Sequence, residues 1–307
     1  MASQSTQVAT LKAKEASIAS KSLTQLALSR LRTDYLTVGA LLILAILGIL
    51  AFLAPVITGA LNVTYYETDT TLQFAEIGTP GHFFGTDELG RDHLARLLYG
   101  GRISLGVALI SAIFSLLIGV TLGLLAGYYN GGVFKWVDDF LMWFITTWNS
   151  IPALYLLILI AAILRPTPTS LVIVLSITSW TFTMRLVRGQ AITLRENEYV
   201  LAARAVGASG FRIMFVHILP NVISLLVVDL AQNIGFLILT ESTLSFLGLG
   251  IREPFPSWGN MLSNAQSYFR LGAHLVFAPG ILIVITVLCL YLIGDGLRDA
   301  FDPESEK

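Results

Sequence analysis

The sequence predicts an all-α polytopic membrane protein with six transmembrane helices. Of its 307 residues 55% are apolar and only 13% are charged, whereas a soluble domain has about 25% charged residues. The mean hydropathy of +0.74 agrees, and the charges leave long gaps. This composition excludes a soluble enzyme, a disordered chain and a nucleic-acid-binding protein.

The gaps between charges place the six helices. Residues 35–66 and 103–134 each form a run of 32 residues without a charge. A helix needs about 20 mainly apolar residues to cross a membrane, and it satisfies its backbone hydrogen bonds internally. The expected spans are 35–58, 103–128, 138–163, 169–188, 219–247 and 274–297.

The basic residues are distributed unequally between the loops that these spans define. With the N-terminus inside, 13 of the 19 Lys and Arg residues lie in inner segments and 6 in outer segments. Basic loops stay in the cytoplasm, so both termini are expected there. The expected organisation is an N-terminal tail (1–33), a first membrane helix (34–58), an extracytoplasmic segment (59–101), a helical core (102–298) with an inner loop (189–218), and a C-terminal tail (299–307).

The inner loop is far longer than the few residues that a simple connection between helices requires. Residues 196–206 favour a helix, Gly207 follows as a break, and 209–217 suit a second short helix. Pro220 then occupies a tolerated position in the first turn of the fifth span. Such a compact knob would bind a partner protein or lie among lipid headgroups, and Gly207 would be a specific contact or a simple helix end.

Four blocks of sequence resemble a known family. Ala202-Ala203, Gly207 and Leu219-Pro220 resemble the EAA loop of binding-protein-dependent ABC transporter permeases, with departures at Leu201 and His217. Residues 198–200 (EYV) resemble the variant found in oligopeptide, dipeptide and nickel permeases. The blocks 84–92, 245–259 and 294–303 are similar to signatures of the C-type subunit of peptide importers.

The resemblance implies a type I ABC importer permease fold with cytoplasmic coupling helices, in a prokaryotic plasma membrane. It implies a homologous second permease, two ABC ATPase subunits, an extracytoplasmic solute-binding protein and membrane lipid as partners. No Gly-x4-Gly-Lys-Ser/Thr loop occurs in the chain, so ATP and magnesium are expected only in the ATPase subunits. The chain would be a transport subunit, not an enzyme, for oligopeptides or dipeptides, or alternatively for nickel, glutathione or oligosaccharides.

The inner loop supplies the residues expected to couple transport to the ATPases. Its small residues allow another backbone to approach closely, and its arginines can reach carboxylates on a partner. More broadly, the arginines of 185–212 are expected to contribute to an ATPase docking site. The coupling candidates are Glu198, Ala202, Ala203, Arg204, Gly207, Arg212 and Pro220.

Polar groups at membrane depth are candidates for the translocation pathway. Asp229, Gln232 and Asn233 share one helical face, and Glu241, near the outer end of the same span, is a further pathway candidate. An ionised carboxylate in lipid is costly. Hydrogen bonds between helices are the structural alternative for this group. A proton-coupled secondary transporter that uses Asp229 and Glu241 is the rival from another class, and a structural membrane subunit is a third alternative.

Two further pathway candidates, Asn149 and Ser150, precede Pro152 in the third span. Proline removes a backbone hydrogen bond and favours a kink, which would be structural or part of a gate.

Outside the membrane, Asp87, Arg91 and Trp258 are candidates for docking the binding protein, and Trp258 is alternatively an interface anchor. Leucines at near-helical spacing predict an amphipathic surface helix over 85–102, which would contact a partner or cap the bundle. A single cysteine and four dispersed histidines indicate no disulfide and no metal site.

Overall fold

The computed structural model describes residues 23–131, 133–163 and 166–301. Of the predicted tails (1–33 and 299–307), residues 1–22 and 302–307 lie outside this range. In these residues the chain forms helices joined by loops, with no β-strand. The helices are α2 (Leu23–Thr33), α3 (Tyr35–Phe52), α4 (Ala54–Leu61), α5 (His93–Tyr128), α6 (Lys135–Trp148), α7 (Ala153–Ile163), α8 (Pro168–Leu194), α9 (Glu198–Ala205), α10 (Gly210–Arg212), α11 (Leu219–Phe246), α12 (Ala265–Tyr268) and α13 (His274–Phe301).

Five helices are long and apolar enough to cross a membrane, and a sixth crossing is available if the bent pair α6 and α7 counts as one. The all-α polytopic prediction is therefore confirmed. The third crossing, expected as one helix over 138–163, is broken at residues 149–152, and its two halves meet at 79°. The break lies where Pro152 predicted a kink.

The second crossing begins earlier than the sequence predicts. Asp92 caps α5 by accepting a hydrogen bond from the Ala95 backbone N–H at 2.7 Å, and the helix continues unbroken to Tyr128. The prediction of a separate surface helix over 85–102 is therefore wrong. Residues 85–92 form turns, and 93–102 are the first turns of the membrane helix itself.

The fifth crossing also begins earlier than expected. A π-helical turn, Ile213–Ile218, joins α10 to α11, so that Gly210–Phe246 forms one long helix. Pro220 has no N–H to donate to the preceding turn, and this irregular turn directly precedes it. The second short helix expected over 209–217 is thus the beginning of the membrane helix, and only α9 is a separate short helix.

Helices α5 and α8 pack closely because α5 carries a stripe of glycines. A Cβ added at Gly119, Gly123 or Gly127 would lie 2.5–2.7 Å from a side chain of α8. Small residues four apart let two membrane helices approach until their backbones nearly touch. Helix α11 packs against α5 beside this contact, and α13 packs on α11 and α3.

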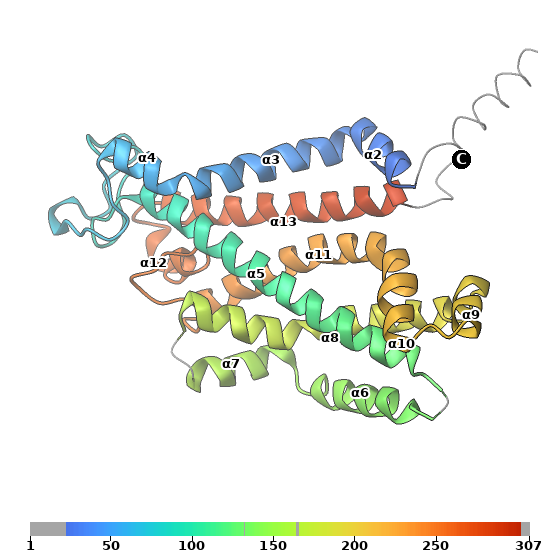
Figure 1. The fold of residues 1–307 in the computed structure, drawn as a ribbon. Coiled ribbons are helices and arrows are strands. Elements are labelled where there is room, and N and C mark those ends of the chain that lie inside the picture. Colours follow the sequence, from blue (N-terminus) through green and yellow to red (C-terminus); the bar gives the residue numbers. More distant parts are fainter. Residues whose placement is uncertain (1–22, 132, 164–165, 302–307) are drawn as a thin grey trace, which may run out of the picture.

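The bundle has two distinct ends (Figure 1). Residues 59–92 and α12 lie at one end, which we call the α4 end. Helices α2 and α9 and the last turn of α13 lie at the opposite end, which we call the α9 end. Helix α6 lies toward the α9 end and α7 toward the α4 end, so the bent pair carries the chain from one end to the other.

Candidate functional site

The loop between α8 and α11 forms a short helical projection at the α9 end. Helix α9 holds Glu198 and Arg204, both exposed, together with Ala202, which is exposed, and Ala203, which is half-buried. The chain then turns at Gly207, whose φ of +85° is a conformation that other residues adopt with strain. Arg212 and Pro220 are exposed further along, in the long fifth crossing.

The projection is held against the bundle by contacts that the sequence did not reveal. Arg195 donates hydrogen bonds to the carbonyl oxygens of Tyr128, at 3.2 Å, and of Asn130. These carbonyls lie at the end of α5, where the helix leaves its acceptors unpaired and favours a positive charge. Val200, a residue of α9, is fully buried, and the Arg204 guanidinium lies 5.7 Å from the centre of the Tyr128 ring.

A second anchor ties α8 to the start of α6. Arg188 donates to both carboxylate oxygens of Asp138 at 2.5 and 2.7 Å, and the Asn130 amide donates to the same carboxylate at 2.6 Å. Arg188 and Arg195 thus have partners within the chain. The expectation that the arginines of 185–212 together form a docking site holds at most for those that remain exposed, Arg185, Arg204 and Arg212.

The projection exposes several apolar side chains beside its charged ones. Val206 is 86% exposed and Phe211 69% exposed, and Tyr199 and Leu201 are also exposed. Exposed apolar side chains gathered on one surface are typical of a site for another protein. A helix anchored to the bundle therefore carries exposed apolar side chains, and beyond the turn at Gly207 the chain enters the long membrane-crossing helix 210–246.

Halfway along the bundle, Asp229 is buried and accepts a hydrogen bond from Thr183 Oγ1 at 2.6 Å. It lines a cavity of about 320 Å³ together with Gln232 and Asn233, so the structure brings these three predicted residues together. The Asn233 amide also donates to Ser115 Oγ on α5, at 3.3 Å.

Glu241 lies apart from this cavity. It is fully buried and accepts hydrogen bonds from Ser104 Oγ at 3.2 Å and Ser245 Oγ at 2.7 Å. Ser104 in turn accepts the backbone N–H of Trp258 at 3.1 Å. Glu241 therefore joins α5 and α11 to the loop that follows α11.

Asn149 and Ser150 are exposed at the break between α6 and α7. Ser150 Oγ donates to the Thr147 carbonyl at 2.6 Å, and Thr181 Oγ1 donates to Asn149 Oδ1 at 3.4 Å. They do not line the Asp229 cavity.

At the α4 end, two arginines and three carboxylates form a network. Arg91 pairs with Asp87 at 2.7 Å, Glu88 at 3.0 Å and Glu253 at 2.9 Å, and Arg96 joins Asp87 at 3.2 Å and Glu253 at 3.0 Å. Burial lowers the pKa of the Arg91 guanidinium, but Asp87 and Glu253 outweigh this effect and raise the pKa above its usual value.

Three of these charged side chains, Asp87, Arg91 and Arg96, are each only 4% exposed. The structure therefore does not present Asp87 and Arg91 as a docking surface. Their partners Arg96 and Glu253 were missed, because Glu253 is 157 residues from Arg96 in the sequence.

Trp258 is likewise internal, at 2% exposure, and its indole N–H donates to the Leu97 carbonyl at 2.9 Å. Its ring packs against Gly100 and Gly101 of α5, where a Cβ would come within 3.3 Å of it. It is neither an exposed docking residue nor an interface anchor.

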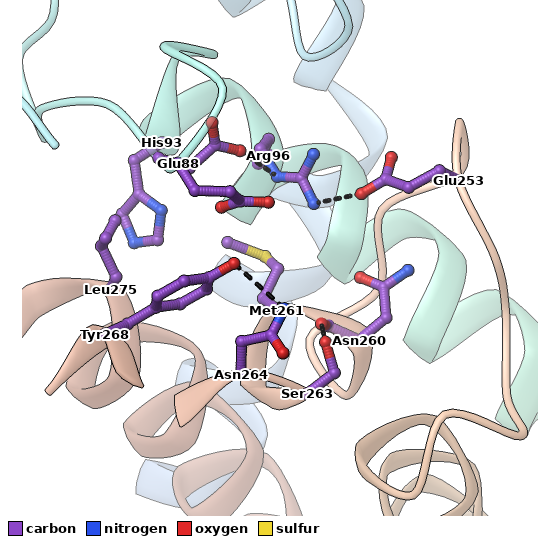
Figure 2. Close-up of a pocket in the computed structure, with 11 residues that line it drawn as sticks. Glu88, His93, Arg96, Glu253, Asn260, Met261, Ser263, Asn264, Tyr268 and Leu275 are labelled. Carbon is purple, nitrogen blue, oxygen red and sulfur yellow. Dashed lines mark hydrogen bonds and ion pairs between the residues drawn. The ribbon is translucent and has the colours of Figure 1, made fainter. Parts of the chain in front are cut away.

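Beside the network lies a polar cavity of about 190 Å³, shown in Figure 2. Arg96 and Glu253 line one side, and Tyr268 and Asn264 line another (Figure 2). His93 also lines it, and neither of its ring nitrogens has a hydrogen-bond partner in the part of the chain that the structure describes. Among all the residues that the structure describes, no group of three or more His, Cys, Asp or Glu side chains could hold a metal ion.

A polytopic helical bundle with an anchored projection at one end and, at membrane depth, a cavity that contains a buried carboxylate is typical of a membrane transport protein. Comparison with known proteins gives its family. Residues 119–307 match the family described as binding-protein-dependent transport system inner membrane component, and the chain belongs to this family. Members are permease subunits of ABC transporters and are not themselves enzymes.

Named relatives cover most of the chain. It is 37% identical to a dipeptide transport system permease protein of Alkalihalophilus pseudofirmus, over 91% of this chain and 89% of that protein. It is 38% identical to a glutathione transport system permease protein of Pectobacterium atrosepticum, over 90% and 89%. An oligopeptide transport system permease protein of Haemophilus influenzae is 37% identical, over 94% and 91%.

The fold agrees with a solved permease. A chain of the MetNI methionine ABC transporter, in an inward-facing conformation, superposes with a TM-score of 0.54 at 21% identity. The superposition covers 67% of this chain and 96% of that one. The resemblance to ABC importer permeases is thereby confirmed, and family membership excludes the rival of a proton-coupled secondary transporter.

Proposed function

We propose that this chain is the C-type permease subunit of an ATP-driven importer of dipeptides or oligopeptides. The anchored projection with its apolar surface carries the mechanistic part of the proposal. The cargo rests on the relatives, which include dipeptide and oligopeptide permeases over about nine-tenths of the chain.

In this proposal the α9 end faces the cytoplasm and docks on one of two ATPase subunits, which bind ATP and magnesium. The exposed coupling residues Glu198, Ala202, Arg204 and Arg212 flank the apolar surface and contact that subunit. Movement of α9 is transmitted through Gly207 into the long helix 210–246, whose tilt opens and closes the pathway. A homologous second permease completes the pathway, and a solute-binding protein delivers cargo at the α4 end.

The test is uptake by proteoliposomes that contain this chain, its sister permease and both ATPases, with the binding protein outside and ATP inside. Uptake of labelled alanylalanine that requires internal ATP and the binding protein supports the proposal. Uptake that proceeds without the ATPases, driven by a proton gradient, would overturn it.

Glutathione is the second candidate cargo, because a glutathione permease is 38% identical to this chain. Parallel assays with glutathione, a tetrapeptide, an oligosaccharide and Ni²⁺ separate the alternatives. If glutathione is accumulated and alanylalanine is not, the cargo assignment changes while the importer mechanism stands.

A further inference from the structure

The cavity beside Asp229 has features of a site for a positively charged group. Its lining combines this carboxylate with the amides of Gln232 and Asn233 and the hydroxyls of Ser179 and Thr183. Three aromatic residues, Phe182, Phe236 and Tyr291, complete the lining, and all three are substantially exposed. A buried carboxylate and exposed aromatic rings, both present in this lining, attract cations.

The carboxylate lies where an unpaired charge is most costly. Asp229 is near the middle of the helix 210–246, and its partner Thr183 is near the middle of α8. An ionised carboxylate at this depth requires a cation or water to compensate for lost hydration. The Thr183 hydroxyl is its one hydrogen-bond donor among the described residues, and no ion pair to it is formed there.

No basic side chain of the surrounding helices is placed to supply that cation. Helices α11 and α13 contain a single Lys or Arg between them, Arg298, at the end of α13. On α8, Arg188 is paired with Asp138. Arg185 is two residues from Thr183, which places it on roughly the opposite side of the helix.

Neighbouring helices restrict two of the amide side chains that line the cavity. Gly294 on α13 faces Gln232, and a Cβ at this glycine would lie 3.0 Å from the Gln232 Cγ. Asn233 is fixed by Ser115 on α5. The polar lining residues therefore come from α8 and α11, α5 contacts Asn233, and α13 contributes Tyr291 to the lining.

We infer that this cavity binds a protonated amine of the cargo during translocation, with Asp229 as its counter-ion. The inference rests on the proposed function for the identity of the cargo. Two sources carry the same chemistry, the N-terminal ammonium of a peptide and a lysine side chain within it. The aromatic residues at the mouth enclose the amine from the side that opens out of this chain.

Charge-selective labelling tests the inference on the assembled complex. In a Cys289→Ala background, Ser179→Cys places a thiol in the cavity, where methanethiosulfonates with a trimethylammonium or a sulfonate group are compared. The cationic reagent is expected to react about tenfold faster than the anionic one, as an uncompensated charge in a cavity concentrates counter-ions. Asp229→Asn should bring that ratio to about one, since the field of the carboxylate is lost.

Glu241→Gln is the matched control, because it neutralises another buried acid of the same helix that does not line the cavity. It should leave the labelling ratio unchanged. Equal rates for the two reagents in the Ser179→Cys complex would overturn the inference, because Asp229 would then carry no charge that the cavity feels.

Protection by cargo distinguishes the sources of the amine. Alanylalanine should slow labelling, and N-acetyl-alanylalanine should not. Protection by N-acetyl-alanyl-lysine would extend the site to side-chain amines, whereas equal protection by N-acetyl-alanylalanine, which has no ammonium group, would overturn the inference. Uptake of alanylalanine by the unmodified complex, measured in parallel, separates failure of this site from failure of the proposed cargo.

Discussion

The two ends of the bundle differ in which of their side chains are buried and which are exposed. At the α4 end, Asp87, Arg91 and Arg96 are buried and paired with one another, and Trp258 is enclosed by glycines of α5. At the α9 end, the projection keeps its apolar side chains in solvent, with Val206 and Phe211 the most exposed. The difference indicates that charged sequence blocks can be internal structure. The α4 end also exposes apolar side chains, such as Phe83 at 69%, so the proposal of a partner site at the projection needs its own test.

The largest loss of stability is expected for Asp87→Ala, at the α4 end. Asp87 accepts from both arginines and from the backbone N–H groups of Leu89 and Arg91. Its removal leaves two buried guanidinium groups short of counter-charge, which costs about 3–5 kcal/mol. The purified complex should lose thermal stability, or the subunit should fail to assemble, as followed by thermal denaturation in detergent and by membrane abundance.

Glu253→Gln is the control, because the Glu253 side chain is half exposed and its pairs are screened by water. The expected cost is at most about 1 kcal/mol. If the Asp87→Ala complex is as stable as the parent but no longer responds to its binding protein, Asp87 is a docking residue after all.

The second-largest loss of stability is expected for Gly123→Leu, in the close contact between α5 and α8. A Cβ at Gly123 would lie 2.7 Å from the Val187 Cβ and from the Met184 carbonyl, so α5 and α8 must separate. Overpacking of this kind costs about 1–3 kcal/mol, again measured as thermal stability of the complex. Gly106→Leu on the same helix meets no atom within 4 Å and should be neutral; equal losses for both variants would refute the close contact.

Much of the fold follows from the sequence, because lipid imposes a simple rule. Long charge-free stretches in a membrane protein are expected to be helices. Five such stretches, and a sixth apolar stretch with two acids, account for the five long helices and the bent pair. The break in the third crossing was also visible, in Pro152. Helix α9 and the turn at Gly207 were predicted from propensity, and both are present.

What could not be predicted depends on contacts between distant residues. Arg96 suggests an external position for 93–102 until Glu253 and Asp87 are seen to neutralise it. Trp258 looks like a surface anchor until Gly100 and Gly101 are seen to make room for its ring. The apolar patch of the projection was in the sequence, but exposure is not readable there.

The smallest expected effect on stability, and the sharpest test of the comparison, is Val206→Glu at the α9 end. Val206 is 86% exposed, so an exposed glutamate should change the stability of the subunit by no more than about 0.5 kcal/mol. In an apolar interface the same carboxylate is desolvated without a partner, which weakens association. The ATPase subunits should therefore dissociate during purification, and binding-protein-stimulated ATP hydrolysis should fall together with uptake.

Val133→Glu is the matched control, because Val133 is 90% exposed in the connection between α5 and α6, outside the projection. If both variants keep their ATPases and full uptake, exposed apolar surface at this end does not identify the partner site. If Val206→Glu alone loses its ATPases and uptake while the subunit stays folded, the apolar side chains at the α9 end form an interface with a second protein, whereas the buried charges at the α4 end stabilise the subunit itself.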